Sequence, residues 1–448
     1  MVPLHRSENG MPDRVNAWVE IALDSLRHNV RVIRAAVGPD TSLLVPVKAD
    51  AYGHGAVPVS RAVLESGADM LGVANPEEGQ LLREAGIDAP VLVLGAVLPD
   101  QAADVVSSQL WQTVSTAASI DALARCSSEA GARAGVFLAV DTGMGRVGVD
   151  PRGALELARR IAAREHLELL GVSTHFPSAD EADKQPSLDQ LAVFRGVLRS
   201  LHAAGIDPKY VSAANSPGVI DIPESRFNLV RPGLATYGVW PSRDTLGRLR
   251  VWPALSLHAR VVQLRTFPPG HPISYGMTAV TQREARIGVV PVGYGDGYSR
   301  RLSNVGCALV RGRRAPLVGR VCMDQCMFDL TDVPGAVEGD EAVLIGTQGG
   351  DHLLVERIAE AVDTTPHEIT TVLGSRLPRF YTDAERGEER RLLSTARIVH
   401  IWAEGGAEGG AGGGAGGAKA GDRAGGAGSD VAAEDGAGER ERARGATI

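Results

Sequence analysis

The chain has 448 residues, of which 44% are hydrophobic, so it is long and apolar enough for two domains with a substantial core. Its formal net charge of -8 and the absence of any dense Lys/Arg block argue against a nucleic-acid or membrane partner, which leaves a small molecule as the expected one. The cysteines are too few for a disulfide framework and match no zinc spacing, so we expect reduced thiols and no metal site. They are Cys126, Cys307, Cys322 and Cys326.

The two ends of the chain differ from the rest in composition. Residues 1–16 lack the apolar run of a secretory signal, and no later stretch reaches the roughly 18 apolar residues of a membrane span. We therefore expect a cytoplasmic protein with a disordered N-terminus. Residues 404–448 are mostly Gly, Ala and scattered charges, which bury too little apolar area to offset their ordering entropy. A disordered tail without a catalytic role is predicted there.

From about residue 42 to about residue 237 the sequence alternates short apolar runs with stretches of helical periodicity, the pattern of repeated βα units. We expect the domain that contains these units to cover residues 17–250. Strands are expected at 43–47, 70–73, 91–94, 111–114, 136–140, 169–174 and 210–212, with a weak one near Leu229. Helices are expected between them, for example at 57–66, 77–85, 153–163 and 188–203. Eight such units over about 200 residues predict an α/β fold, a (β/α)8 TIM-type barrel.

The remaining ordered segments have a different pattern. Residues 251–385 show β-branched and apolar alternation broken by Pro and Gly, as in 256–263 and 285–290, which predicts a mainly β C-terminal domain. Residues 17–22 alternate like a strand but precede the barrel units. Two places therefore stay open for this strand, the barrel and the β domain.

One lysine stands where barrel enzymes keep their active sites. Lys48 follows the first expected barrel strand, at the carboxyl-terminal rim. An ammonium in that crowded mouth needs either a carboxylate partner or a chemical use, such as holding a carbonyl compound. Both interpretations stay open from this segment alone.

Polar residues also follow other expected strands and would converge on the same rim. Each is weak alone, since His175 suits a structural histidine and Asn215-Ser216 suits a helix cap. Gly and Ser at such positions let backbone N–H groups approach a phosphate, which barrels often bind beside the late strands. The residues concerned are Asp141, Arg146, Thr174, His175, Asn215, Ser216, Arg231 and Gly233.

Two further segments need weighing. Residues 143–148 fit a dinucleotide-binding glycine pattern, but the next helix is expected only from Pro151, so these glycines would not form its first turn. In the β domain, Tyr275 and the aromatics of 290–298 lie among glycines. A loop tyrosine alone is more often a packing or surface residue.

Taken together, these segments resemble the alanine racemase family. Residues 48–55 (KADAYGHG) are similar to its cofactor-lysine signature, which usually has Asn where Asp50 stands. Other similar segments follow in the same order: 141–146, 174–176, 214–216, 230–233, 274–276, 293–298 and 318–325. The resemblance spans about residues 17–381. It implies a pyridoxal 5'-phosphate (PLP) enzyme acting on an amino acid, and a homodimer in which each active site takes the tyrosine loop of the other chain.

The resemblance also implies roles for individual residues. Lys48 holds PLP and acts on one face of the substrate, while Tyr275 acts on the other. Tyr52, Ser216 and Gly233 hold the phosphate, with Asn215 beside them. Arg231 faces the pyridine nitrogen and His175 supports it. Arg146 contacts the phenolic oxygen of PLP, and Met323 and Asp324 line the substrate side.

The implied chemistry is racemisation of alanine, which would supply D-alanine for cell-wall peptidoglycan. PLP delocalises the charge left when the α-hydrogen departs, and inversion then needs an acid and a base on opposite faces. The usual pKa values of lysine and tyrosine, about 10.4 and about 10, must fall for this near neutral pH, and nearby arginines would lower them.

Three departures from the family pattern concern the surroundings of the site. Ala139 stands where many relatives have a modified lysine that orients the arginine, so Arg146 needs another partner. Ser212 replaces a histidine, and His367 replaces a tyrosine at the entrance. These changes leave other functions open: a racemase or epimerase of another amino acid such as serine, a barrel-type decarboxylase or lyase, and a PLP carrier without turnover.

Overall fold

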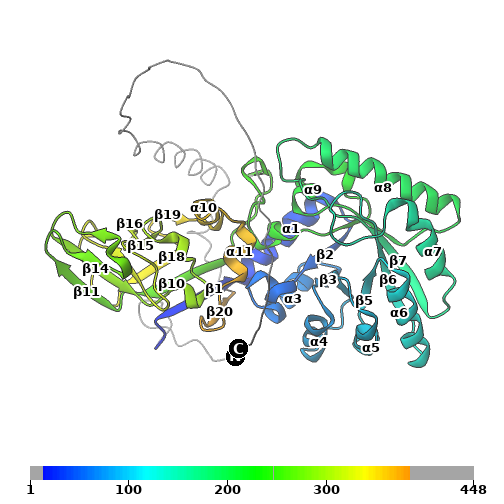
Figure 1. Cartoon of the computed structure of the whole chain (residues 1–448), viewed down its shortest axis with the longest axis horizontal. Coiled ribbons are helices and arrows are strands. Elements are labelled where there is room, and N and C mark those ends of the chain that lie inside the picture. Colours follow the sequence, from blue (N-terminus) through cyan, green and yellow to red (C-terminus); the bar gives the residue numbers. More distant parts are fainter. Residues whose placement is uncertain (1–13, 246, 384–448) are drawn as a thin grey trace, which may run out of the picture. The chain divides into compact units, whose positions relative to one another are not determined.

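The computed structural model describes residues 14–245 and 247–383 (Figure 1). The tail predicted at 404–448 and residues 1–13 of the predicted N-terminal disorder lie outside these residues. Among the helices of the described part, none combines the length and the apolar character needed to cross a bilayer.

Eight parallel strands form the first sheet, in the order β8-β7-β6-β5-β4-β3-β2-β9. Hydrogen bonds from Arg231 N to Ala214 O (2.9 Å) and from Val211 N to the Asn228 side chain (2.7 Å) join the region of β9 to that of β8. The strands are β2 (Ser42–Pro46), β3 (Met70–Val73), β4 (Val91–Val93), β5 (Trp111–Val114), β6 (Ala134–Ala139), β7 (Leu167–Ser173), β8 (Tyr210–Ser212) and β9 (Leu229–Val230). The predicted barrel is confirmed, nearly closed on itself.

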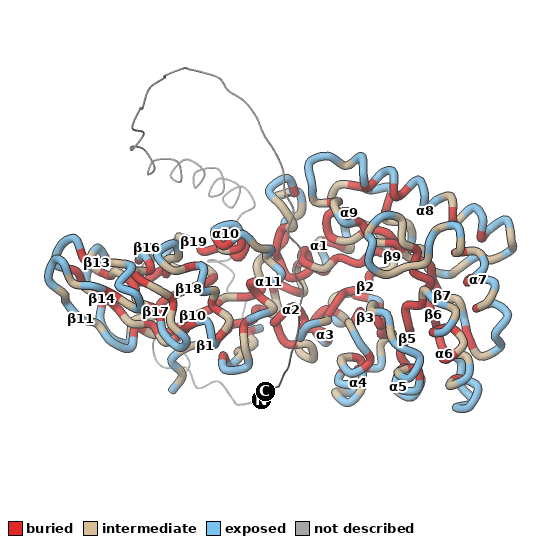
Figure 2. Tube along the Cα trace, viewed as in Figure 1, coloured by how far each residue is buried: buried red, intermediate tan, exposed pale blue. Residues whose placement is uncertain are grey.

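Side-chain alternation explains how these strands close. Large apolar residues from six strands form one buried cluster, as expected when every second residue of a barrel strand points inward. Residues on the other face of each strand pack against the surrounding helices in the main core. Figure 2 shows that much of the chain along these strands is buried. The inner cluster consists of Leu44, Met70, Leu92, Phe137, Leu170 and Leu229.

Helices alternate with the barrel strands along the chain. Several begin at caps visible in the sequence, such as Asn75 for α4 and Thr116 for α6. The predicted helix 153–163 starts with a 3-10 turn at Pro151–Gly153, because Asp150 caps that turn. The helices are α1 (Leu23–Val37), α3 (Ala56–Glu65), α4 (Pro76–Glu84), α5 (Ala102–Ser107), α6 (Ala117–Glu129), α7 (Ala154–Ala162), α8 (Gln185–Ala203) and α9 (Ser216–Asp221).

The C-terminal part is mainly β, which confirms the predicted class. A seven-stranded sheet has the order β16-β15-β18-β10-β1-β20, with β19 paired to β18, and a smaller sheet has the order β11-β14-β17. The strands are β1 (Ala17–Ala22), β10 (Leu255–Arg260), β11 (Gln263–Phe267), β12 (Pro272–Ile273), β13 (Ala279–Val280), β14 (Ala285–Val290), β15 (Cys307–Val310), β16 (Arg313–Pro316), β17 (Cys326–Asp329), β18 (Glu341–Gln348), β19 (Asp351–Leu353) and β20 (Arg379–Thr382). Two short helices, α10 (Val355–Ala361) and α11 (Pro366–Thr371), follow β19.

Strand β1 pairs with β10 and β20 and so lies in the sheet of the β domain, although it comes first in the chain. The apolar run 256–263 divides between two sheets. Val261 N donates to Asp340 O and Val262 N to Val289 O, so the chain changes partner strand at this point.

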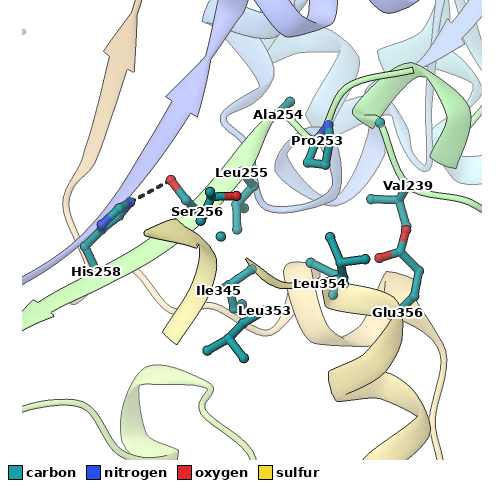
Figure 3. A pocket seen from close by; sticks show the side chains of 14 residues that line it. Val239, Pro253, Ala254, Leu255, Ser256, His258, Ile345, Leu353, Leu354 and Glu356 are labelled. Carbon is teal, nitrogen blue, oxygen red and sulfur yellow. Dashed lines mark hydrogen bonds between the residues drawn. The ribbon is translucent and has the colours of Figure 1, made fainter. Parts of the chain in front are cut away.

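A cavity of about 80 Å³ lies between the segment after the barrel and the β domain (Figure 3). His258 on β10 contacts Ser256 (2.7 Å) and Glu341 of β18 (3.0 Å), which ties these two strands together. Glu356 on α10 also lines the cavity and accepts a hydrogen bond from Trp240 N (3.0 Å). Burial raises the pKa of Glu356 to about 7.

Candidate active site

Lys48 begins a left-handed turn directly after β2. Residues 49–52 all have φ of 52–53°, and Gly53 continues at 81°. Left-handed backbone costs roughly 1–2 kcal/mol for each residue with a Cβ, so the surroundings must hold these four residues in place. The turn, labelled α2 (Lys48–Tyr52), places the lysine at the barrel rim with a half-buried side chain.

Contacts from the C-terminal elements hold the far end of this turn. A Cβ at Gly53 would lie 2.1 Å from Thr370 O, and one at Gly55 would lie 1.9 Å from Tyr381 Oη. Arg379 Nε also donates to Gly53 O (2.9 Å). The β domain therefore closes directly over the lysine turn, which explains both glycines.

Lys48 lies close to Arg146, and both lie close to His175. Burial lowers the pKa of the Lys48 amine, and the charge of Arg146 lowers it further. His175 feels the charges of Arg231, Arg146 and Lys48, and together with its burial these lower its pKa to about 3, so its ring is neutral. The structure thus brings together four residues that the sequence predicted at separate strand ends.

Arg231 is buried and bonded only to neutral acceptors in the described residues. Its guanidinium donates to Ser212 Oγ, to Thr174 O (2.6 Å) and toward His175 Nδ1 (3.5 Å). Burial and the charge of Arg146 lower its pKa to about 10, so it stays protonated near neutral pH. Arg231 therefore keeps a hydrogen-bond partner at this position, because the Ser212 hydroxyl accepts from its guanidinium.

A polar cradle for a phosphate lies beside these cations. A Cβ at Gly233 would lie 3.1 Å from Tyr52 Oη, so the glycine leaves room in front of the phenol. Ser216 opens α9, where Asn215 caps the helix by accepting from Gly218 N (3.1 Å). Backbone N–H groups at such turns suit a phosphate dianion. Burial raises the pKa of Tyr52 to about 12, which keeps it a hydrogen-bond donor.

The glycine-rich segment after β6 closes on Asp141 rather than on a helix. Asp141 Oδ1 accepts from the N–H groups of Gly143, Met144 and Gly145, and Oδ2 accepts from Arg146 N (3.2 Å). Across the described residues the Arg146 guanidinium forms no ion pair, and Ala139 is buried at the end of β6. The loop therefore holds Arg146 near enough to Lys48 for its charge to lower the pKa of the amine.

Tyr275 lies apart from this cluster, in a short helical turn of the β domain that covers Tyr275–Met277. Its side chain is 71% exposed, and that of Met277 is 68% exposed. Ser274 anchors the turn by donating to Arg320 O (2.8 Å). The predicted acid/base tyrosine is thus exposed on its own chain.

Met323 and Asp324 belong to the same region as Tyr275. Ser274 Oγ approaches Cys322 Sγ at 3.7 Å, which links the two loops. Met323 is exposed, and Asp324 accepts from Arg376 Nη2 (2.7 Å). His367, the third departure from the family pattern, lies beside Tyr52 with ring centroids 5.5 Å apart. Two groups of predicted residues result, one around Lys48 and one around Tyr275.

Two residues at the lysine turn were not predicted. Glu78 accepts a hydrogen bond from Ala49 N (2.7 Å), and Tyr237 donates to Pro46 O (2.8 Å) and packs against Tyr52. A helix-start acid such as Glu78 is usually a cap, and a buried tyrosine is usually core. The sequence around each residue does not distinguish this common role from a role at the lysine turn.

The comparisons with known proteins agree with this arrangement. The model of the alanine racemase N-terminal domain matches residues 21–241, and that of the C-terminal domain matches residues 254–381. This chain belongs to the alanine racemase family. An alanine racemase from Halothermothrix orenii is 43% identical over 364 residues, covering 81% of this chain and 96% of the relative. One from Symbiobacterium thermophilum is also 43% identical with the same coverage.

Solved alanine racemases have the same fold. The crystal structure from D-cycloserine-producing Streptomyces lavendulae has a TM-score of 0.79 and 38% identity, covering 83% of this chain and 98% of that one. The Bacillus anthracis enzyme with bound L-Ala-P has a TM-score of 0.78 and 36% identity, covering 83% and 96%. The predicted resemblance to alanine racemases is therefore confirmed.

Proposed function

We propose that this chain racemises alanine with PLP bound at Lys48, and that the product D-alanine serves cell-wall peptidoglycan in the cytoplasm. The observation that carries the proposal is a half-buried lysine at the barrel rim, beside Arg146 and near a neutral histidine. Membership of the alanine racemase family supports the same activity.

The residues around Lys48 fit PLP. Tyr52, Asn215, Ser216 and Gly233 would hold its phosphate, and Arg146 would contact its phenolic oxygen. Arg231, supported by His175, would face the ring nitrogen. It would donate a hydrogen bond to this nitrogen without transferring its proton, so the nitrogen would stay unprotonated. When bound, PLP stabilises the charge left by α-hydrogen loss.

Two groups of this chain would then move protons. The lowered pKa of Lys48 leaves a larger share of free amine to take a proton on one face of the substrate. Tyr275 would give or take a proton on the other face through its hydroxyl. Met323 and Asp324 would line the substrate side.

We also propose that the active enzyme is a homodimer with shared sites. Tyr275, Met277 and Met323 form an exposed group that includes large apolar side chains. A second copy that covered this group would place its own Lys48 cluster against Tyr275 of the first chain. The first chain would do the same for the second, which is the reciprocal arrangement typical of twofold dimers. The domain limits 17–250 and 251–385 are part of this proposal, with the exception of β1, which pairs with strands of the β domain.

Proton NMR in heavy water tests the activity directly. Each L-amino acid is incubated with PLP-loaded protein, and α-hydrogen loss and optical rotation are followed. Exchange with inversion of alanine supports the proposal. Carbon dioxide release would indicate a decarboxylase, faster inversion of serine would indicate another substrate, and a lack of exchange with every amino acid would indicate a carrier.

A further inference from the structure

Glu78 joins two loops at the barrel rim. It stands in the first turn of α4, where its own N–H donates to the cap Asn75 (2.9 Å). One oxygen of its carboxylate accepts from Ala49 N and the other from Ala74 N, both at 2.7 Å. A single side chain thus connects the segment after β2 with the segment after β3.

The contact with Ala49 falls at the critical point of the lysine turn. Ala49 directly follows Lys48 and is the first residue with left-handed backbone. Hydrogen bonds to a carboxylate are stronger than those to neutral acceptors, so this contact counts against the strain of the turn. The far end of the turn has separate support from Asp50, whose carboxylate accepts from Ala56 N (2.7 Å).

The charge of Glu78 also reaches Lys48. It raises the pKa of the amine, in opposition to burial and Arg146, which lower it. Among the described residues, the carboxylate of Glu78 forms no ion pair with Lys48. Its oxygens are used by backbone N–H groups instead, so the amine is left available.

We propose that Glu78 is a positioning residue for the cofactor lysine: by bridging Ala49 and Ala74 it fixes the left-handed turn and hence the direction of the Lys48 side chain. The inference rests on the proposed function in one respect, that Lys48 is the residue to which PLP binds.

Two substitutions separate the reach of Glu78 from its charge. Glu78→Gln keeps the length but places an NH2 group against one of the two N–H donors. Glu78→Asp keeps the charge but is one methylene too short to span both. Glu77→Gln is the matched control, since Glu77 is an exposed neighbour on the same helix.

The first measurement is hydrogen exchange of the 48–53 backbone in the PLP-free protein. The second is PLP affinity, from the visible absorbance of the bound cofactor, with reduction and peptide mapping to identify the labelled lysine. We expect both Glu78 variants to lose protection at 49–53 and to bind PLP roughly tenfold to a hundredfold more weakly. Glu77→Gln should match the unchanged protein in both measurements.

Either of two results would overturn the role: unchanged exchange and affinity in both Glu78 variants, or the same losses in the control Glu77→Gln. If a Glu78 variant fails to fold by circular dichroism, the other variant decides. A wild-type protein that binds no PLP at Lys48 would instead refute the proposed function. In that case the exchange measurement would still show whether Glu78 holds the turn.

Discussion

The two groups of predicted active-site residues differ in how the chain supports them. The lysine turn is enclosed: Thr370, Arg379 and Tyr381 contact it from the β domain, and Glu78 contacts it from the barrel. The Tyr275 turn is exposed and is anchored through Ser274. One chain thus encloses the lysine turn but presents Tyr275 outward.

In the proposed homodimer, this difference would divide the work between two copies. The lysine side would need rigidity, because the amine would have to meet a fixed cofactor carbon. The tyrosine side would become fixed only when a second chain covers it. The predictions below test that contrast, from the largest expected effect to the smallest.

Replacing Lys48 by Ala should abolish racemisation, by roughly ten-thousandfold or more, because it removes both the cofactor attachment and one proton-transfer group. The visible absorbance of bound PLP should vanish as well. Circular dichroism of alanine measures the rate. Lys209→Ala is the control, since Lys209 is exposed just before β8, at the opposite end of the barrel. Remaining inversion in Lys48→Ala would contradict its role.

Replacing Tyr275 by Phe should slow racemisation by roughly a hundredfold to ten-thousandfold while leaving the PLP absorbance intact. Proton exchange should be lost chiefly for one alanine enantiomer, since only one face loses its proton-transfer group. NMR in heavy water with each enantiomer checks this. Tyr210→Phe, on β8, is the control and should behave as the unchanged protein.

Mixing the two inactive variants tests the shared site. If Tyr275 acts on the other chain, a mixed dimer has one intact site, and random exchange should restore about one quarter of full activity. If Tyr275 acts within its own chain, every site contains a substitution. Mixing would then restore nothing, and the homodimer proposal would fail.

The stability of the chain should depend on pH through Glu356, which lines the cavity between the segment after the barrel and the β domain. Its usual pKa is 4.5, and in the folded chain it is about 7, so folding favours the protonated form. Its stabilising contribution is present below pH 4.5 and is lost as the pH rises through 7, by on the order of 3 kcal/mol. Urea unfolding at pH 5 and pH 8 measures this loss in the free energy of unfolding. The loss should be smaller in Glu356→Gln and unaltered in the exposed control Glu284→Gln.

Replacing Ser212 by Ala should have the smallest effect, because Arg231 keeps Thr174 O and His175 as acceptors. Losing one hydrogen bond to a buried charge should lower the free energy of unfolding by about 1.5–3 kcal/mol. It should change the racemisation rate less than Tyr275→Phe does. Thermal unfolding measures the change in stability, and the racemisation assay measures the change in rate. A loss of PLP binding would show that Ser212 does more than orient Arg231.

The barrel was predictable because its strands are short, apolar and followed by polar residues, so Lys48, His175 and Arg231 could be placed on one rim. The left-handed turn was not, because alanines at 49 and 51 give no sign of positive φ. Glu78 was missed since a helix cap and a bridge between loops use the same residue type. The enclosing contacts of Thr370 and Tyr381 join positions more than 300 residues apart, beyond any local pattern.

The enclosure of Gly53 and Gly55 has a consequence for biosynthesis. The residues that complete the lysine pocket, at 370–381, leave the ribosome only after the whole barrel has been made. A nascent or truncated chain ending near residue 250 would lack the surface that confines the turn. If PLP binds at Lys48 as proposed, we expect it to be captured only after the β domain has been made.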